Sequence, residues 1–134
     1  MTLSLIGYLG WVAAGSAAGG MARFFVSGLV ARRVGETFPW GTMTVNVTGS
    51  FTIGLLSVLA GKMGMLGRPE AWPLLATGFL GAYTTVSSFS LQTLALARDG
   101  QGRRALVNIV LSLALCLGAA ALGLGLGAVI VGAA

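Results

Sequence analysis

Long apolar stretches alternate with short charged clusters along this chain. The charged residues gather at positions 32–36, 62–70 and 98–104, and the four segments between them carry no charge apart from Arg23. A helix of about 20 apolar residues is long enough to cross the hydrocarbon core of a bilayer. Single strands cannot cross lipid because their backbone groups would stay unpaired. The pattern therefore predicts four membrane-spanning helices, at about residues 4–30, 42–61, 72–97 and 105–131.

The composition supports a membrane protein. The chain has 134 residues, of which 56% are hydrophobic and only 8% charged, and its mean hydropathy is +0.92. A soluble domain carries about 25% charged residues, so a soluble fold is excluded. We expect a single all-α, multi-pass membrane domain over residues 1–134. The uncharged start of the chain, up to Ala22, lacks a basic region and predicts a first span rather than a cleaved signal peptide.

The net charge of +5 raises the question of a nucleic-acid partner. The basic residues lie between apolar runs, and no binding motif accompanies them, so we expect contact with the lipid bilayer and no nucleic acid. The first and third loops together carry five basic residues and the second loop carries two. By the positive-inside rule, this modest bias favours both termini outside.

The predicted spans lack the histidine and acidic residues that several classes of membrane protein need for their function. The chain has no histidine, and its three acids (Glu36, Glu70 and Asp99) fall in the predicted loops. An intramembrane enzyme therefore lacks its usual acids and bases, and a proton-coupled small multidrug transporter lacks the carboxylate that its chemistry needs inside the membrane. A membrane scaffold subunit would explain the many glycines but not the polar groups described below. Cys116 is the single cysteine, so the chain contains no disulfide.

Glycine is frequent, at 22 of 134 residues. Gly15 and Gly19 in the first span are four residues apart, and small pairs at this spacing let helix backbones approach closely in lipid. The fourth span carries further glycines, namely Gly118, Gly123, Gly125 and Gly127. We expect these residues to pack helices together. Because a four-helix protomer is thin, some faces are expected to pack against another subunit.

Polar residues recur at helical spacing in the second and fourth spans. Those in the second span form one stripe, made of Thr42, Asn46, Gly49, Ser50 and Ser57. The amide of Asn46 offers two N–H donors, which suit either a dehydrated anion or an interhelical hydrogen bond. In the fourth span Asn108, Ser112 and Cys116 form a second stripe. Ser112 either faces a ligand or bonds back to its own helix.

The third span carries the most unusual segment. Gly78 and Gly81 precede residues 84–90, where five of seven side chains are hydroxyls. This composition favours a local break in the helix, whose freed carbonyls could hold a cation. The alternative is a kinked helix with its hydroxyls bonded back to the backbone. Phe89 lies within the run, and its ring edge carries partial positive charge that would suit a small anion.

Three segments together resemble the CrcB/Fluc family of fluoride channels. They are residues 19–24 (GGMARF), 40–51 (WGTMTVNVTGSF) and 78–90 (GFLGAYTTVSSFS). The first is similar to the family's glycine-rich stretch that ends in arginine. The second and third are similar to its specific GT-x-x-VN-x-x-G-S/G and GF-x-GG-x-TTFSTFS signatures. The resemblance extends over all four spans in order.

The resemblance implies an antiparallel, dual-topology homodimer in the bacterial inner membrane, with a third helix broken in mid-span. Two pores per dimer would let fluoride leave the cell passively, which protects the cell from fluoride. The implied ion pathway comprises Arg23, Asn46, Thr85, Ser88, Phe89 and Ser112.

The resemblance also implies a structural Na⁺ at the dimer centre, bound by the backbone carbonyls of Gly81 and Thr84. One position departs from the family pattern. Val86 stands where the family has its first pore phenylalanine, so one proposed contact to the anion is missing.

Overall fold

The computed structural model describes residues 4–62, 68 and 70–132, and this part of the chain is helical apart from short connections. The elements are α1 (Leu5–Val34), α2 (Trp40–Lys62), the π-helix η1 (Pro73–Leu80), the short α3 (Gly81–Tyr83), α4 (Val86–Arg98) and α5 (Gly102–Gly132).

Four helical stretches of the described chain are long and apolar enough to cross a membrane: Leu5–Val34, Trp40–Gly61, Pro73–Arg98 and Gly102–Gly132. The prediction of an all-helical protein with four such stretches is confirmed. The observed helices run past the predicted ends because charged residues continue them: α1, for example, includes Arg32 and Arg33 in its last turn. Positive side chains there also complement the negative end of the helix dipole. Residues 1–3, which precede the predicted first span of about residues 4–30, lie outside the described residues.

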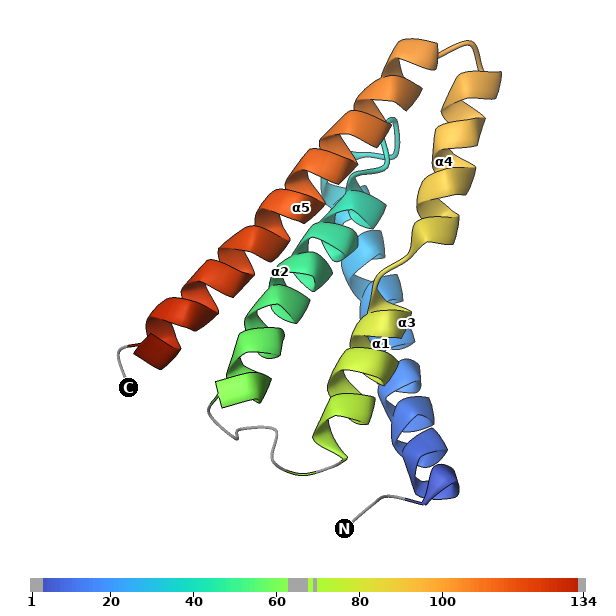
Figure 1. Cartoon of the computed structure of the whole chain (residues 1–134). Helices are drawn as coiled ribbons and strands as arrows, with labels where there is room; N and C mark the ends of the chain where they lie inside the picture. The colour runs from blue at the N-terminus through green and yellow to red at the C-terminus, as the bar shows by residue number, and fades with distance from the viewer. Residues whose placement is uncertain (1–3, 63–67, 69, 133–134) are drawn as a thin grey trace.

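The four stretches run alternately in opposite directions (Figure 1). Most packing within the protomer lies between α2 and α5 and between α1 and η1, while α1 also contacts α2 and α3. The turn after α1 requires glycine, because Gly35 has a φ of 93°, in the left-handed region. Its N–H donates to the Ala31 carbonyl at 2.8 Å and closes the helix end.

Glycines let α1 approach η1 at backbone distance. A Cβ at Gly15 would collide with the Leu74 carbonyl, and one at Gly19 would collide with the Phe79 carbonyl. From the other side, a Cβ at Gly78 would lie 2.6 Å from the Val12 carbonyl oxygen. The predicted packing role of Gly15 and Gly19 is therefore confirmed, and it holds the first span tightly against the start of the third.

The contact between α2 and α5 uses glycine in the same way. A Cβ at Gly123 would collide with the Phe51 carbonyl, and one at Gly127 would lie 2.9 Å from the Val58 Cβ. Gly118 and Gly125 have open space where a Cβ would lie, so these two glycines do not pack helices together within the described chain. They lie on other faces of α5, which carry exposed apolar side chains.

The third stretch is made of two helical pieces. It begins as η1, continues as α3, and leaves helical geometry at Thr84 (φ −81°, ψ 159°) and Thr85 (φ −153°, ψ 119°) before α4 begins at Val86. Figure 1 shows α4 leaning away from α3 after this extended link. The link is held by residues of α1 and α2, and its surroundings form the candidate site.

Candidate functional site

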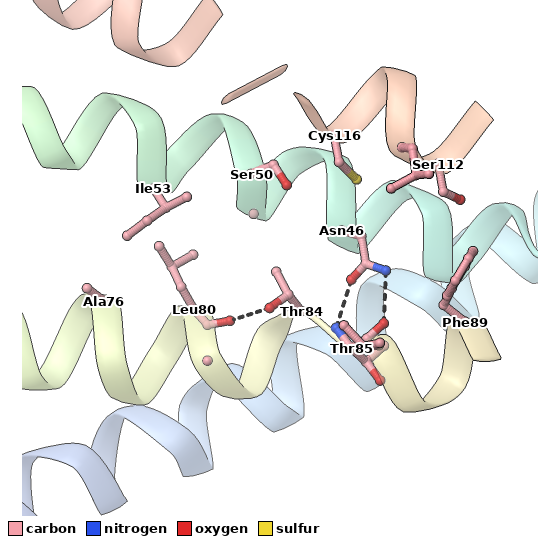
Figure 2. A pocket seen from close by; sticks show the side chains of 14 residues that line it. Asn46, Ser50, Ile53, Ala76, Leu80, Thr84, Thr85, Phe89, Ser112 and Cys116 are labelled. Carbon is pink, nitrogen blue, oxygen red and sulfur yellow. Dashed lines mark hydrogen bonds between the residues drawn. The ribbon is translucent and has the colours of Figure 1, made fainter. Parts of the chain in front are cut away.

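The side chain of Asn46 on α2 forms two hydrogen bonds with the backbone of the extended link. Its Nδ2 donates to the Thr85 carbonyl at 2.9 Å, and the Thr85 N–H donates to its Oδ1 at 2.7 Å (Figure 2). An extended peptide presents its N–H and C=O to a neighbour, and a side-chain amide has the complementary donor and acceptor. Of the two roles that the sequence left open for Asn46, the interhelical hydrogen bond is therefore present. One N–H of the amide is committed to Thr85, which leaves the second for another acceptor.

Thr85 also caps the helix that follows. Its hydroxyl accepts from the Ser88 N–H at 3.1 Å, which satisfies one of the free donors at the start of α4. The same hydroxyl lies 3.1 Å from the Oγ atoms of both Ser87 and Ser88. Only 6% of Thr85 is exposed. Thr85, Ser87 and Ser88, which belong to the predicted hydroxyl run, thus form a local hydrogen-bond network at the start of α4.

These bonds leave the carbonyls of Gly81 and Thr84 without their helical donors. In an α-helix each carbonyl accepts from the N–H four residues later. For Gly81 that donor is Thr85, which bonds to Asn46 instead. For Thr84 it is Ser88, which bonds to the Thr85 hydroxyl instead. The family resemblance implies a cation at these two residues, and in the structure their carbonyls lie where helical pairing stops.

Side chains from α1 and α2 fix the position of Thr84. Arg23 Nη1 donates to the Thr84 carbonyl at 3.4 Å, and the Thr84 hydroxyl donates back to the Leu80 carbonyl at 2.9 Å. Gly49 is required beside it, because a Cβ there would collide with the Thr84 methyl group. Arg23 on α1 therefore brings its positive charge to the same link that Asn46 on α2 binds.

A cavity of about 520 Å³ opens beside the Asn46–Thr85 pair. Most of its wall is apolar, with Ile53 and Leu80 facing each other across it, and its polar groups gather around Asn46 (Figure 2). It brings together six of the residues that the sequence singled out: Asn46, Gly81, Thr84, Thr85, Phe89 and Ser112. Val86 also lines it and is 76% exposed, as is expected of a side chain at an open edge.

The other two predicted residues, Arg23 and Ser88, line a separate cavity of about 290 Å³. Ser27 and Thr42 add two hydroxyls to it, and Thr85 borders both cavities. A further cavity of about 430 Å³ shares Ser27, Thr42 and Ser88 and extends toward the loop after α1. The three cavities thus share lining residues between that loop and the Asn46–Thr85 pair, and Ser27 is a lining residue that the sequence pattern did not indicate.

The stripe predicted on the fourth span divides between two roles. Ser112 and Cys116 line the large cavity. Asn108, however, is only 1% exposed and bonds to Thr93 on α4, with Nδ2 to Oγ1 at 2.9 Å. The Ser112 hydroxyl points to Asn108 Oδ1 at 3.5 Å rather than to its own helix backbone.

Comparison with known proteins decides the family. The family described as CrcB-like protein, Camphor Resistance (CrcB), matches residues 10–124. The chain belongs to the CrcB family. The resemblance that the three sequence segments suggested is thereby confirmed.

Curated CrcB relatives match most of the chain. Fluoride-specific ion channel FluC 2 of Bradyrhizobium diazoefficiens is 60% identical over 81% of this chain and 80% of its own length. Fluoride-specific ion channel FluC 2 of Rhodopseudomonas palustris is 59% identical over 80% of this chain and 82% of its own. Fluoride-specific ion channel FluC of Opitutus terrae is 54% identical over 80% and 82%. The CrcB match includes every residue of the candidate site, from Arg23 to Ser112.

Proposed function

We propose that this protein is a passive, fluoride-selective channel that exports fluoride and confers fluoride resistance, and that it is not an enzyme. The observation that carries the proposal is the cavity beside the Asn46–Thr85 pair, whose few polar groups gather around Asn46, in a chain of the CrcB family. The acids Glu36, Glu70 and Asp99 lie outside the four apolar stretches, so nothing in the described chain favours proton-coupled transport.

Selectivity follows from how the site would replace the water around the ion. Fluoride is small and strongly hydrated, so it needs closely placed donors once it leaves water. Asn46, Ser112 and Phe89 all line the large cavity; the second N–H of Asn46 is the donor that we expect to serve the ion there, with the positive edge of the Phe89 ring beside it. Arg23, Thr85 and Ser88 line the smaller cavity, where Arg23 and Ser88 are the side chains with donors to offer. Chloride is larger and gains less from donors set so closely together.

The proposal places two copies antiparallel in the bacterial inner membrane, in dual topology, with two pores per dimer. The open cavity supports a second copy, because its edge residues Gly81 and Val86 are exposed in the protomer. The extended link at Thr84 and Thr85 would then lie near the middle of the bilayer. Irregular backbone at that depth needs protein or water around it, which a partner and a pore provide.

The same arrangement accommodates a structural Na⁺. The carbonyls of Gly81 and Thr84 have both lost their helical donors and are oxygen ligands of the kind that a hard cation takes; that of Thr84 also accepts from Arg23 Nη1 at 3.4 Å, so Na⁺ would share it with the guanidinium. Two carbonyls are too few for a complete site, and those of an inverted second copy would complete it. Bound there, the cation would supply positive potential near the pores and connect the two copies.

The test is fluoride efflux from liposomes that contain the purified protein, followed with a fluoride electrode. We expect rapid fluoride loss, little chloride loss, and much slower fluoride loss in Asn46→Ala. Ser57→Ala is the matched control, because Ser57 lies on the same helix, bonds back to the Gly54 carbonyl at 2.8 Å and does not line the cavity. Absence of fluoride flux from folded wild-type protein, or equal rates in Asn46→Ala and wild type, would contradict the proposal.

A further inference from the structure

Asn108 on α5 is almost completely enclosed, at 1% exposure, although it carries a polar amide. A buried amide is costly unless it is paired, and in the described structure both of its ends have a partner. Nδ2 donates to Thr93 Oγ1 on α4 at 2.9 Å, and Oδ1 accepts from the Ser112 hydroxyl at 3.5 Å. Asn108 itself does not line the large cavity.

The bonds around Asn108 connect two residues that do line the cavity. Thr93 has one hydroxyl proton, which it donates to the Phe89 carbonyl at 2.7 Å. Its oxygen must therefore accept from Asn108, and this fixes which way the amide faces. The result is a continuous chain in the order Ser112, Asn108, Thr93 and Phe89, in which the direction of each of the three hydrogen bonds is assigned.

The position of α4 depends on its contacts with neighbouring helices, including the hydrogen bond between Asn108 and Thr93. A continuous helix would fix the direction of α4, but the extended residues Thr84 and Thr85 precede it. Within the described protomer α4 packs mainly against α5 and only slightly against α2. Asn108 and Thr93 supply the side-chain hydrogen bond that joins α4 to α5. This bond therefore helps to fix the location of Phe89 on α4 relative to Ser112 on α5.

We propose that Asn108 and Thr93 are positioning residues that set the spacing between the Phe89 ring and the Ser112 hydroxyl, and thereby the preference for fluoride over chloride. The inference rests on the proposed function. Neither residue needs to touch the ion. If their bond is lost, α4 can move away from α5, and the gap between ring and hydroxyl widens enough to admit a larger anion.

The experiment compares Thr93→Val, which keeps the shape and removes the hydroxyl, with Thr93→Ser, which keeps the hydroxyl. Asn108→Leu and the double variant Asn108→Leu/Thr93→Val complete a cycle. Each protein is first checked for folding and homogeneity by size-exclusion chromatography and circular dichroism. Fluoride and chloride efflux are then measured from the same liposome preparation. The readout is the ratio of the two rates, because a loss of folded protein lowers both rates equally and leaves the ratio unchanged.

The expected fluoride-to-chloride ratio falls by about three- to tenfold in Thr93→Val and Asn108→Leu, the range that loss of one hydrogen bond commonly produces. Thr93→Ser keeps the wild-type ratio, and the double variant is no worse than the single variants. A wild-type ratio in Thr93→Val would overturn the inference while the proposed function stands. So would a Thr93→Val that fails to fold while Thr93→Ser folds, because the bond would then be needed for folding. Absence of fluoride flux in wild type would instead refute the proposed function.

Discussion

Asn46 and Thr85 are joined by two hydrogen bonds, of 2.9 and 2.7 Å, between a side-chain amide and a main-chain peptide 39 residues away. This pairing keeps the Thr85 N–H away from the Gly81 carbonyl, where a continuous helix would place it. One residue thus performs two tasks. It holds the extended link in place, and it leaves its second N–H for the cavity.

Replacing Asn46 with Asp should damage both tasks. Aspartate keeps an acceptor for the Thr85 N–H, but it loses the donor to the Thr85 carbonyl and adds a negative charge beside the cavity. We expect a loss of stability of about 1–3 kcal/mol, from the carbonyl left without its donor, and fluoride efflux below detection. Thermal unfolding in detergent and liposome efflux measure the two effects. Fluoride efflux near the wild-type rate would show that Asn46 does not border the path of the ion.

The glycines of α5 allow a matched comparison. A Cβ at Gly123 would meet the Phe51 carbonyl on α2, whereas nothing lies within 4 Å of a Cβ at Gly118. Gly123→Ala must separate α2 from α5, and overpacking of this kind costs about 1–3 kcal/mol. Gly118→Ala should be tolerated within the protomer. The unfolding midpoints of the two variants in detergent check this, and equal midpoints would refute the assigned packing.

The sequence could predict the four helices and the chemistry of the site, but not how the polar groups pair. Helical spacing was enough to place Asn46 on a polar stripe, because that spacing is local. Its partner is a main-chain group on a distant segment, and only the tertiary arrangement selects it. Asn108 likewise belonged to a stripe with Ser112, yet its amide faces Thr93 rather than the cavity. Gly118 and Gly123 look alike in sequence, and only the neighbouring helix distinguishes them.

Removal of sodium tests the proposed cation site. If the carbonyls of Gly81 and Thr84 bind Na⁺ between two copies, exchange of Na⁺ for the bulky cation N-methyl-D-glucamine should lower the dimer fraction and the fluoride flux together. Restoring Na⁺ should recover both. Dimer fraction is measured by cross-linking in detergent, and flux in liposomes prepared with each cation. An unchanged dimer fraction and flux without Na⁺ would exclude a structural role for the ion.

Val86 offers a gain-of-function test at the edge of the cavity. It lines the cavity and is 76% exposed, so a larger side chain can be accommodated there without displacing the core of the protomer. Valine has no ring edge to present to an anion, and Phe89 is the one aromatic residue among the described residues that line this cavity.

Val86→Phe should therefore raise the fluoride-to-chloride ratio by about three- to tenfold, the effect expected of one favourable aromatic contact. Val86→Leu is the control, because leucine adds bulk without an electropositive edge and should leave the ratio near that of wild type. Liposome efflux of the two ions measures both variants. If leucine and phenylalanine change the ratio alike, the bulk of the side chain acts at this position rather than its charge distribution. If Val86→Phe instead stops fluoride flux, the cavity edge in this chain is shaped around valine, and Phe89 alone serves the pore.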